Sequence, residues 1–232
     1  MSRSAIDPGR FDVLENAPLH DVLCSVVAAF RSERIALASG FGPGSAVLIH
    51  VLAELGIRIP VIFIDTLYHF PETIEHVERV HERYGLDLRV HRPADSRVAF
   101  EDLYGPRLWE RDLDAYHLLT KIEPFRFATA RLDAWITGRR RDQSRTRSTL
   151  PVIESGRQRR INPLAAWTRS DIWRFIRLHG LPYNPLHDDG YTSIGDEALT
   201  TRVSPGEDER AGRWRDLGRL ECGIHLSTGS AG

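Results

Sequence analysis

The chain has 232 residues with little cysteine and almost no lysine. Its two cysteines, Cys24 and Cys222, lie far apart and make no disulfide framework, so a reducing cytoplasm is the expected location. No run of about eighteen apolar residues occurs, which excludes a membrane-spanning helix and gives no reason to expect a membrane partner. Residues 1–8 lack the apolar core of a signal peptide. These absences favour a soluble globular protein.

The common signatures of metal and nucleotide sites are also missing. Neither Cys-x-x-Cys nor His-Glu-x-x-His occurs, and His76 and His81 are too far apart for one helical face, so no protein-bound metal is expected. The Gly-Lys-Ser/Thr of a Walker loop and the dinucleotide fingerprint are absent. With a net charge of −1, an anion site must come from locally clustered arginines, and no nucleic-acid partner is expected.

Lys121 is the one lysine among 31 basic residues. A chain that otherwise uses arginine throughout has kept lysine at a position that arginine does not fill equally well. Lysine carries a compact charge on a flexible stem, whereas arginine carries a rigid planar fork. The alternative is chance survival on a solvated surface.

Apolar runs and helical periodicities alternate along the chain and predict an α/β fold with a mostly parallel sheet. The crossovers are long enough for parallel, right-handed connections. A capping box at Thr168 predicts a helix that ends at Gly180. Cys24 is expected to be buried on the helix of residues 11–32, which Pro18 interrupts. Strands are predicted at 35–38, 60–64, 86–90, 134–137 and 159–164, with helices between them at 46–55, 73–84, 95–120 and 121–132.

Two turns of this pattern are suited to a nucleotide. A glycine-rich turn joins the first strand to a helix, where free N–H groups and the helix dipole favour a phosphate. The second strand runs into Asp65 and Thr66, at the sheet edge where open parallel sheets bind ligands. The candidate residues of the first turn are Ser39, Gly40, Phe41, Gly42 and Ser45. A glycine-rich turn alone is also compatible with a purely structural role.

The fourth strand leads into residues 138–147, which carry five arginines against one aspartate. Because the run follows a glycine at the end of a strand, it favours a clamp for a small polyanion over a solvated face or a nucleic-acid patch. The candidate binding residues are Gly138, Arg139, Arg140, Gln143 and Arg147.

Beyond residue 200 the sequence becomes polar and rich in turns, which predicts a nucleotide-binding α/β domain of residues 1–200 and a C-terminal arm of residues 201–232. The arm brings Arg202, Arg210 and Arg213, which we expect to fold over the site. Cys222 lies between a carboxylate and a glycine near a chain end, where a thiol is better placed to react than to pack. An unselected thiol near a frayed tail is the alternative.

Ordered motifs along residues 33–225 resemble those of the assimilatory phosphosulfate reductases, which act on 3′-phosphoadenylyl sulfate (PAPS) or adenylyl sulfate (APS). The resemblance rests on Ser39–Gly42, Ile64–Thr66 with His69–Thr73, Lys121–Pro124, Gly138–Arg140 with Asp142–Ser144, Pro185-Leu186 with Asp188–Tyr191, Ser193–Asp196, Thr200–Arg202 and Glu221–His225. It implies an adenine nucleotide α-hydrolase-like (PP-loop type) fold. It also implies that the glycine turn and the Asp65–Thr66 turn hold the nucleotide.

For the chemistry, the resemblance implies assimilatory sulfate reduction, in which the cysteine near the C-terminus attacks the sulfate sulfur. Thioredoxin or glutaredoxin then releases sulfite from a Cys222 S-sulfo intermediate. Lys121 and Arg147 are expected to hold the phosphosulfate and to stabilise the leaving group, and Arg139 and Arg140 to serve a 3′-phosphate. His225 assists by charge or hydrogen bond, or is a packing residue. We also expect a homo-oligomer, a dimer being the simplest.

Three departures from the family pattern matter. The iron–sulfur type of APS reductase has cysteines where this chain has His117–Thr120 and Asp196–Thr200, so no cluster is expected and the chain resembles the PAPS type. Leu67 replaces a family glycine and would be strained if its φ were positive. Gly40 and Pro43 are not the usual residues of the first turn.

Other functions stay open. Reduction of APS by the same mechanism without a cluster is one. A PP-loop enzyme that uses ATP is another, such as the small subunit of sulfate adenylyltransferase or a tRNA thiolase, although the aspartate of their Ser-Gly-Gly-x-Asp-Ser loop is absent here. A catalytically silent nucleotide- or RNA-binding protein is the third.

Overall fold

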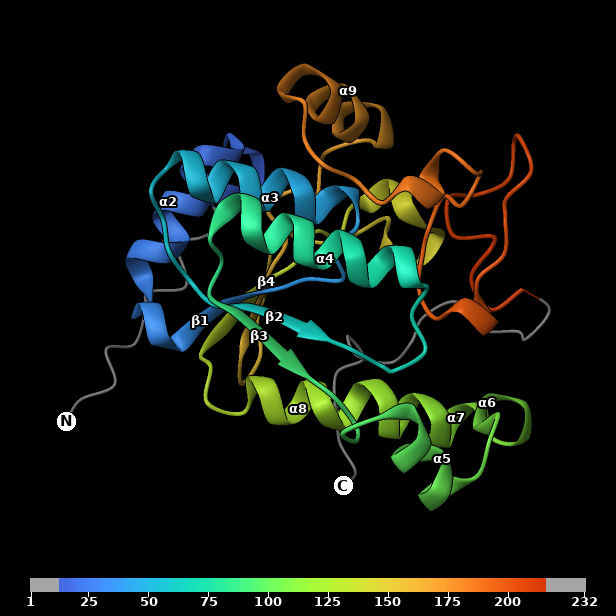
Figure 1. Ribbon diagram of the computed structural model, residues 1–232. Helices are drawn as coiled ribbons and strands as arrows, with labels where there is room; N and C mark the ends of the chain where they lie inside the picture. Colours follow the sequence, from blue (N-terminus) through green and yellow to red (C-terminus); the bar gives the residue numbers. More distant parts are fainter. Residues whose placement is uncertain (1–12, 216–232) are drawn as a thin grey trace.

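The computed structural model describes residues 13–215 and shows a layered α/β fold (Figure 1). Within these residues the strands form a six-stranded sheet in the order β3-β2-β1-β4-β6-β5. Every described pairing is parallel except β5 with β6. The strands are β1 (Ile35–Ala38), β2 (Val61–Ile64), β3 (Leu88–His91), β4 (Ala134–Ile136), β5 (Ile153–Glu154) and β6 (Arg159–Ile161). The predicted mostly parallel sheet is confirmed.

Helices cover both faces of the sheet (Figure 1). One face carries α2 (Leu19–Ala29), α3 (Pro43–Glu54), α4 (Pro71–Tyr84) and α9 (Arg169–His179). The other carries α5 (Arg97–Tyr104), α6 (Leu108–Arg111), α7 (Leu113–His117) and α8 (Glu123–Thr129). Shorter 3₁₀ turns lie at Val13–Asn16, Ser32–Arg34, Arg141–Gln143, Arg145–Arg147, Pro185–His187 and Glu197–Leu199, and a π-helical turn spans Leu118–Ile122. No described helix is both long enough and apolar enough to cross a membrane.

The central strand β1 shows why the two helical layers form. Its side chains alternate between the faces of the sheet and are fully buried on both. Ile35 and Leu37 belong to the larger core under α3 and α4, whereas Ala36 packs with Phe125 and Trp135 on the α8 side. A strand buried on both faces must be apolar throughout, as the run Ile-Ala-Leu-Ala is.

Helix ends follow local chemistry. The predicted capping box at Thr168 is confirmed, since Asp171 N donates to Thr168 Oγ1 at 3.2 Å and Thr168 N donates to Asp171 Oδ2 at 2.9 Å. Helix α3 begins at Pro43, three residues before the predicted start, because proline is well suited to the first helical turn. Strand β5 was not predicted, as two residues give no periodic signal.

The prediction that Cys24 is buried was wrong. The buried stripe of α2 consists of Leu19, Val22, Leu23 and Val26, and Cys24 lies off this stripe with its side chain exposed. A helix turns about 100° per residue, so a position next to an apolar stripe in sequence can face solvent.

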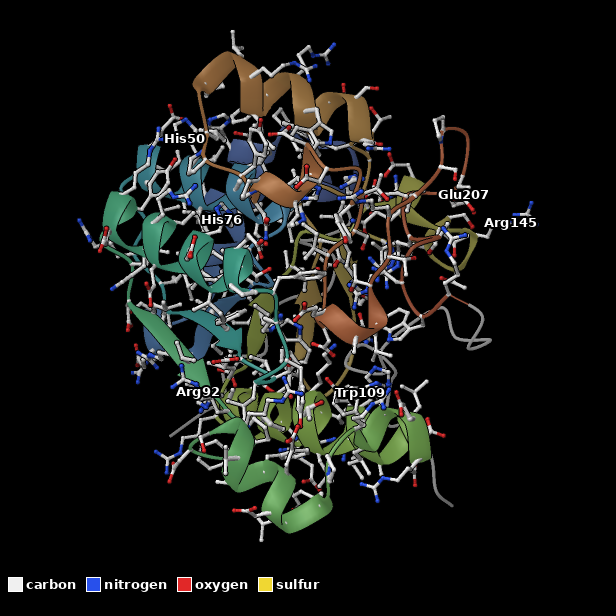
Figure 2. All side chains as sticks on the ribbon, turned by 45° about the vertical axis from the view of Figure 1, so that its right-hand side comes forward. His50, His76, Arg92, Trp109, Arg145 and Glu207 are labelled. Atoms are coloured by element: carbon white, nitrogen blue, oxygen red, sulfur yellow. The ribbon has the colours of Figure 1, made fainter. Side chains whose placement is uncertain are left out.

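Two buried histidines, His76 and His117, and the half-buried His187 make the stability of the fold sensitive to acid. Burial lowers the pKa of His76 on α4 (Figure 2), of His117 and of His187 to about 4 in each case. These rings are neutral in the folded chain but take up protons near pH 6.5 when unfolded. We therefore expect the free energy of unfolding, measured by denaturant titration, to fall as the pH is lowered from about 6.5 to 4.

His117→Gln provides a matched test, because glutamine keeps an acceptor for Trp214 Nε1, which donates to His117 Nε2 at 3.0 Å. The variant should reduce the pH slope of the unfolding free energy by up to about 1.4 kcal/mol per pH unit in this range. An unchanged slope would show that His117 does not titrate on unfolding.

Candidate active site

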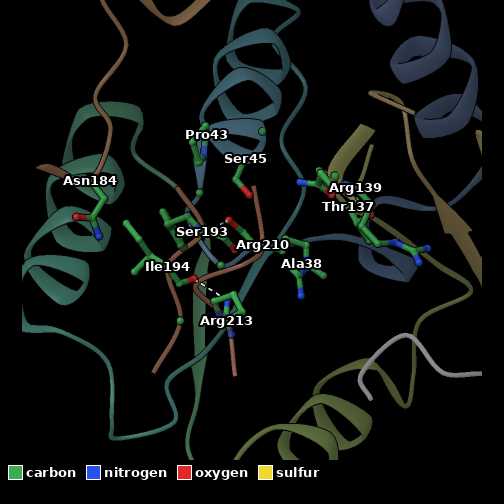
Figure 3. Close-up of a pocket in the computed structure, with 18 of the residues that line it drawn as sticks. Ala38, Pro43, Ser45, Thr137, Arg139, Asn184, Ser193, Ile194, Arg210 and Arg213 are labelled. Carbon is green, nitrogen blue, oxygen red and sulfur yellow. Dashed lines mark hydrogen bonds between the residues drawn. The ribbon is translucent and has the colours of Figure 1, made fainter. Parts of the chain in front are cut away.

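A cavity of about 290 Å³ lies at the carboxyl ends of β1, β2 and β4 (Figure 3). Its walls include Ala38 and Ile64 from the strand ends, Thr137 just after β4, and the first turn of α3 with Pro43 and Ser45. Strands β1 and β4 are neighbours in the sheet. After β1 the chain continues to β2 on one side of this pair, whereas after β4 it continues to β5 and β6 on the other side, so the carboxyl ends of β1 and β4 flank a crevice. Open parallel sheets bind ligands at such a point.

The glycine-rich turn forms one wall of this cavity. All of its predicted residues, Ser39, Gly40, Phe41, Gly42 and Ser45, line the cavity. Phe41 has a φ of 54°, in the left-handed region that non-glycine residues rarely adopt. Its N–H donates to Ser39 Oγ at 3.0 Å, and its ring packs edge-on against Phe63 at 5.5 Å. These contacts hold the turn in shape next to the first turn of α3, whose leading N–H groups have no intrahelical partner.

A close contact between two glycines joins this turn to the arginine loop. A Cβ on Gly44 would lie 2.9 Å from Gly138 O, and one on Gly138 would lie 3.1 Å from Gly44 C. Neither backbone could approach so closely with a side chain present. The contact sets the two anion-binding segments side by side, although 94 residues separate them in the chain (138 − 44).

The arginine loop lines the cavity with Gly138, Arg139, Arg140, Gln143 and Arg147, as predicted. Carboxylates neutralise more of the positive charge of this loop than the local sequence indicated. Arg140, only 2% exposed, donates to Asp142 Oδ1 at 2.9 Å and to Glu209 Oε2 at 2.6 Å, and Arg139 pairs with Glu154. Among the described lining residues, the charged ones are Lys121, Arg139, Arg140, Arg147, Arg210, Arg213 and Glu209. The cavity therefore retains an excess of cations.

Lys121 reaches the cavity from the π-helical turn, an irregularity often found at functional sites. It is 7% exposed, and its Nζ lies 2.7 Å from Asp196 Oδ2. Asp196 also accepts hydrogen bonds from Tyr116 Oη at 2.9 Å and from Thr66 Oγ1 at 2.7 Å. Burial alone would raise the pKa of Asp196, but the charges of Lys121 and His69 and these hydrogen bonds hold it below its ordinary value. The ionised carboxylate thus fixes the ammonium group at the cavity wall.

Three predicted binding residues do not line the cavity. Asp65 accepts from Leu67 N at 2.9 Å and from Arg92 Nε at 2.7 Å, and Thr66 is bound to Asp196. Arg202 is exposed, and its guanidinium lies 5.6 Å from the centre of the Tyr191 ring. Leu67 has a φ of 70°, so the strain expected for this replacement of a glycine is present. The Asp65–Thr66 turn supports the wall from outside the cavity.

Part of the predicted C-terminal arm contributes to the cavity wall. Arg210, Arg213 and Trp214 line the cavity, and an Arg213 N–H donates to Ile194 O at 3.0 Å (Figure 3). Thr201 N donates to Gly212 O at 2.8 Å, which closes the arm on itself. Trp214 is 2% exposed beneath it. Cys222 and His225 lie outside the described residues.

Further lining residues were not picked out as candidates from the sequence. Some of them, such as His69 and the segment from Ser193 to Gly195, lie within motifs that carried the family resemblance. Others, such as Asn184, His187 and Glu209, lie in polar stretches with no pattern of their own. The burial-lowered pKa of His187, about 4, makes its ring a neutral part of the wall at pH 7.

Comparison with known proteins identifies the family of this chain. Residues 34–202 match the family described as phosphoadenosine phosphosulfate reductase domain. An adenosine 5′-phosphosulfate reductase of Halalkalibacterium halodurans is 44% identical over 83% of this chain and 85% of its own length. A phosphoadenosine 5′-phosphosulfate reductase of Xanthomonas axonopodis pv. citri is 45% identical over 83% of this chain and 82% of its own.

A solved structure is also similar. The crystal structure of phosphoadenylyl-sulfate (PAPS) reductase from Candida auris, a phosphate complex, superposes with a TM-score of 0.76 at 31% identity and covers 87% of this chain and 100% of that one. The chain therefore belongs to the phosphoadenosine phosphosulfate reductase family.

Proposed function

We propose that this protein reduces PAPS to sulfite and adenosine 3′,5′-bisphosphate with electrons from thioredoxin or glutaredoxin. The observation that carries the proposal is the cluster of cationic side chains around a cavity that also borders a nucleotide-type glycine turn. A phosphosulfate nucleotide is a polyanion with an adenosine end, and such a cavity offers partners to both. The names of the similar proteins support reduction of a phosphosulfate nucleotide.

The choice between PAPS and APS rests on the arginine loop. Lys121 and Arg147 suffice for a phosphosulfate, so Arg139 and Arg140 would serve a 3′-phosphate that displaces or shares their carboxylate partners. The similar proteins do not decide the matter, because one is named for each substrate. A cluster-free reaction fits this chain, since His117–Thr120 and Asp196–Thr200 stand where the iron–sulfur type has cysteines. His117 and Asp196, within these segments, are buried and hydrogen-bonded. APS reduction by the same route is the second candidate.

The proposed reaction begins with the Cys222 thiolate attacking the sulfur atom of the substrate. The S–O bond to the phosphate breaks, its electron pair goes to the phosphate oxygen, and an S-sulfocysteine forms. A thiolate of the reduced redoxin then attacks Cys222 Sγ and releases sulfite, and its second thiol closes the redoxin disulfide to return Cys222 as a thiol. Lys121 and Arg147 stabilise the charge that develops on the leaving phosphate.

The arm makes this delivery of Cys222 possible. Glu209, Arg210, Arg213 and Trp214 of the arm already line the cavity, and Cys222 follows Arg215 by seven residues. Seven residues span at most about 25 Å, so the thiol can reach the cavity without displacing the rest of the arm. We propose that residues 201–232 act as a unit that presents Cys222, with His225 beside it. An ordinary thiol is only a few per cent ionised at neutral pH, and the cations of the cavity would raise that fraction.

The substrate assignment is tested by measuring sulfite release from PAPS and from APS, each with and without reduced thioredoxin or glutaredoxin. We expect rapid release from PAPS that requires the redoxin, and slower release from APS. Faster turnover of APS would move the assignment to the second candidate. No sulfite from either nucleotide would leave a silent binding protein or an ATP-using enzyme as the function.

Cys222→Ser should abolish sulfite formation while leaving nucleotide affinity near that of the wild type, because serine removes the nucleophile but not the binding cations. Cys24→Ser is the matched control, since Cys24 is exposed on α2 and should be dispensable. Mass spectrometry after mixing with substrate alone should find one sulfonate adduct on Cys222 in the wild type and none in Cys222→Ser. Sulfite production by Cys222→Ser would refute the mechanism.

Lys121→Arg should lower kcat at least about tenfold although it keeps the charge. Asp196, Tyr116 and Thr66 fix a small buried site for one ammonium group, which a planar guanidinium does not fit. The control is Arg126→Lys on α8, an exposed exchange of the same two residue types that should leave kcat unchanged. Full activity in Lys121→Arg would show that only the charge of Lys121 matters.

A further inference from the structure

A second group of polar side chains lies away from the cavity, where α3 packs beneath α9 (Figure 1). It consists of His50 and Glu54, one turn apart on α3, and His179 at the end of α9. Each offers one ligand atom, and these atoms all lie within 4.8 Å of one another. Two imidazoles and a carboxylate converging from two helices form a typical donor set for a transition metal.

His50 is the best-positioned member of this group (Figure 2). Its Nε2 is buried and lies 3.3 Å from Glu54 Oε1. Its Nδ1 lies 3.3 Å from the hydroxyl of Tyr84 on α4. A histidine that binds a metal through one nitrogen commonly has the other held by such a partner, which fixes the ring.

His179 is held next to His50 by aromatic packing. Its ring stacks on Phe175, one turn earlier on α9, with centroids 4.1 Å apart and an angle of 23° between the planes. The centroids of His179 and His50 are 5.0 Å apart, and Phe175 also packs edge-on against His50 at 5.9 Å. The two imidazoles are therefore neighbours because of the packing of α3 on α9 and do not depend on a metal to meet.

We propose that His50, Glu54 and His179 bind a divalent transition metal of the zinc class, with water in the fourth position. Zinc–nitrogen bonds of about 2.0–2.1 Å place tetrahedral ligand atoms about 3.3 Å apart. His50 Nε2 and Glu54 Oε1 already have this separation. Glu54 and His179 are exposed, so small side-chain rotations can shorten the other separations between ligand atoms, which are at most 4.8 Å.

The nearby charges permit a cation here. The carboxylate of Glu54 offsets one of its charges. Arg83 of α4 is the nearby cation whose charge opposes metal binding, and its Nη1 donates a hydrogen bond to Gly180 O at 3.1 Å. The site departs from the expectation that the protein binds no metal. The sequence could not indicate it, because 125 residues separate Glu54 from His179 (179 − 54) and only the packing of the two helices joins them.

The proposal is tested by titrating the metal-free, full-length protein with Co²⁺ and with Zn²⁺. The Cys222→Ser background is used so that this thiol does not bind the metal. We expect one equivalent of Co²⁺ to bind with the visible absorption of a four-coordinate site, Zn²⁺ to displace it, and Zn²⁺ to raise the melting temperature. His179→Ala and Glu54→Gln should each weaken binding at least about tenfold.

His20→Ala is the matched control, because His20 is an exposed histidine on α2 and should not affect the titration. Circular dichroism of each variant shows whether it is folded before metal is added. The proposal is overturned if the folded protein binds no stoichiometric metal, or if His179→Ala and His20→Ala bind it equally well. Because the site is remote from the cavity, this result is independent of any sulfite assay.

Discussion

The buried carboxylate of Asp196 connects the parts of the molecule that surround the cavity. It receives Lys121 from the π-helical turn, Tyr116 from α7 and Thr66 from the turn after β2. A buried charge is tolerated only when it is paired and hydrogen-bonded. Loss of any one of these partners would therefore leave the remaining buried groups with an uncompensated desolvation penalty. The position of the ammonium group therefore depends on three separate segments of the chain being in place together. This makes the site a property of the completed fold.

The sheet brings these segments together. Its central strands end at one edge, and the close contact of Gly44 with Gly138 fixes the distance between the glycine turn and the arginine loop. The arm then covers the opening, with Trp214 buried against His117 and an Arg213 N–H bound to Ile194 O. A polyanionic nucleotide would thus be held from several sides by groups that different elements position. Binding strength and placement come from the same contacts.

Much of this could be predicted from the sequence. Apolar runs and helical periodicity identified five of the six described strands and their mostly parallel pairing, and a short motif identified the capping box at Thr168, because these signals are local. The glycine turn, Lys121 and the arginine loop were also recognisable as cavity residues. What the sequence did not indicate were partners that meet only through folding, such as Glu209 on Arg140 and Asp196 on Lys121. The exposure of Cys24 was missed because apolar neighbours in sequence do not fix the direction of a helical side chain.

The contact between Glu209 and Arg140 has a consequence for ligand exchange. In the described structure the carboxylate of Glu209 accepts a hydrogen bond from the buried guanidinium of Arg140, which lines the cavity. An anion that comes to Arg140 must first displace this resident carboxylate, so its measured affinity is reduced by the strength of an internal competitor. When the anion departs, Glu209 can pair with Arg140 again, so that Arg140 does not remain an unpaired buried charge. A built-in competitor of this kind weakens the hold on a spent nucleotide and favours rapid turnover over tight retention.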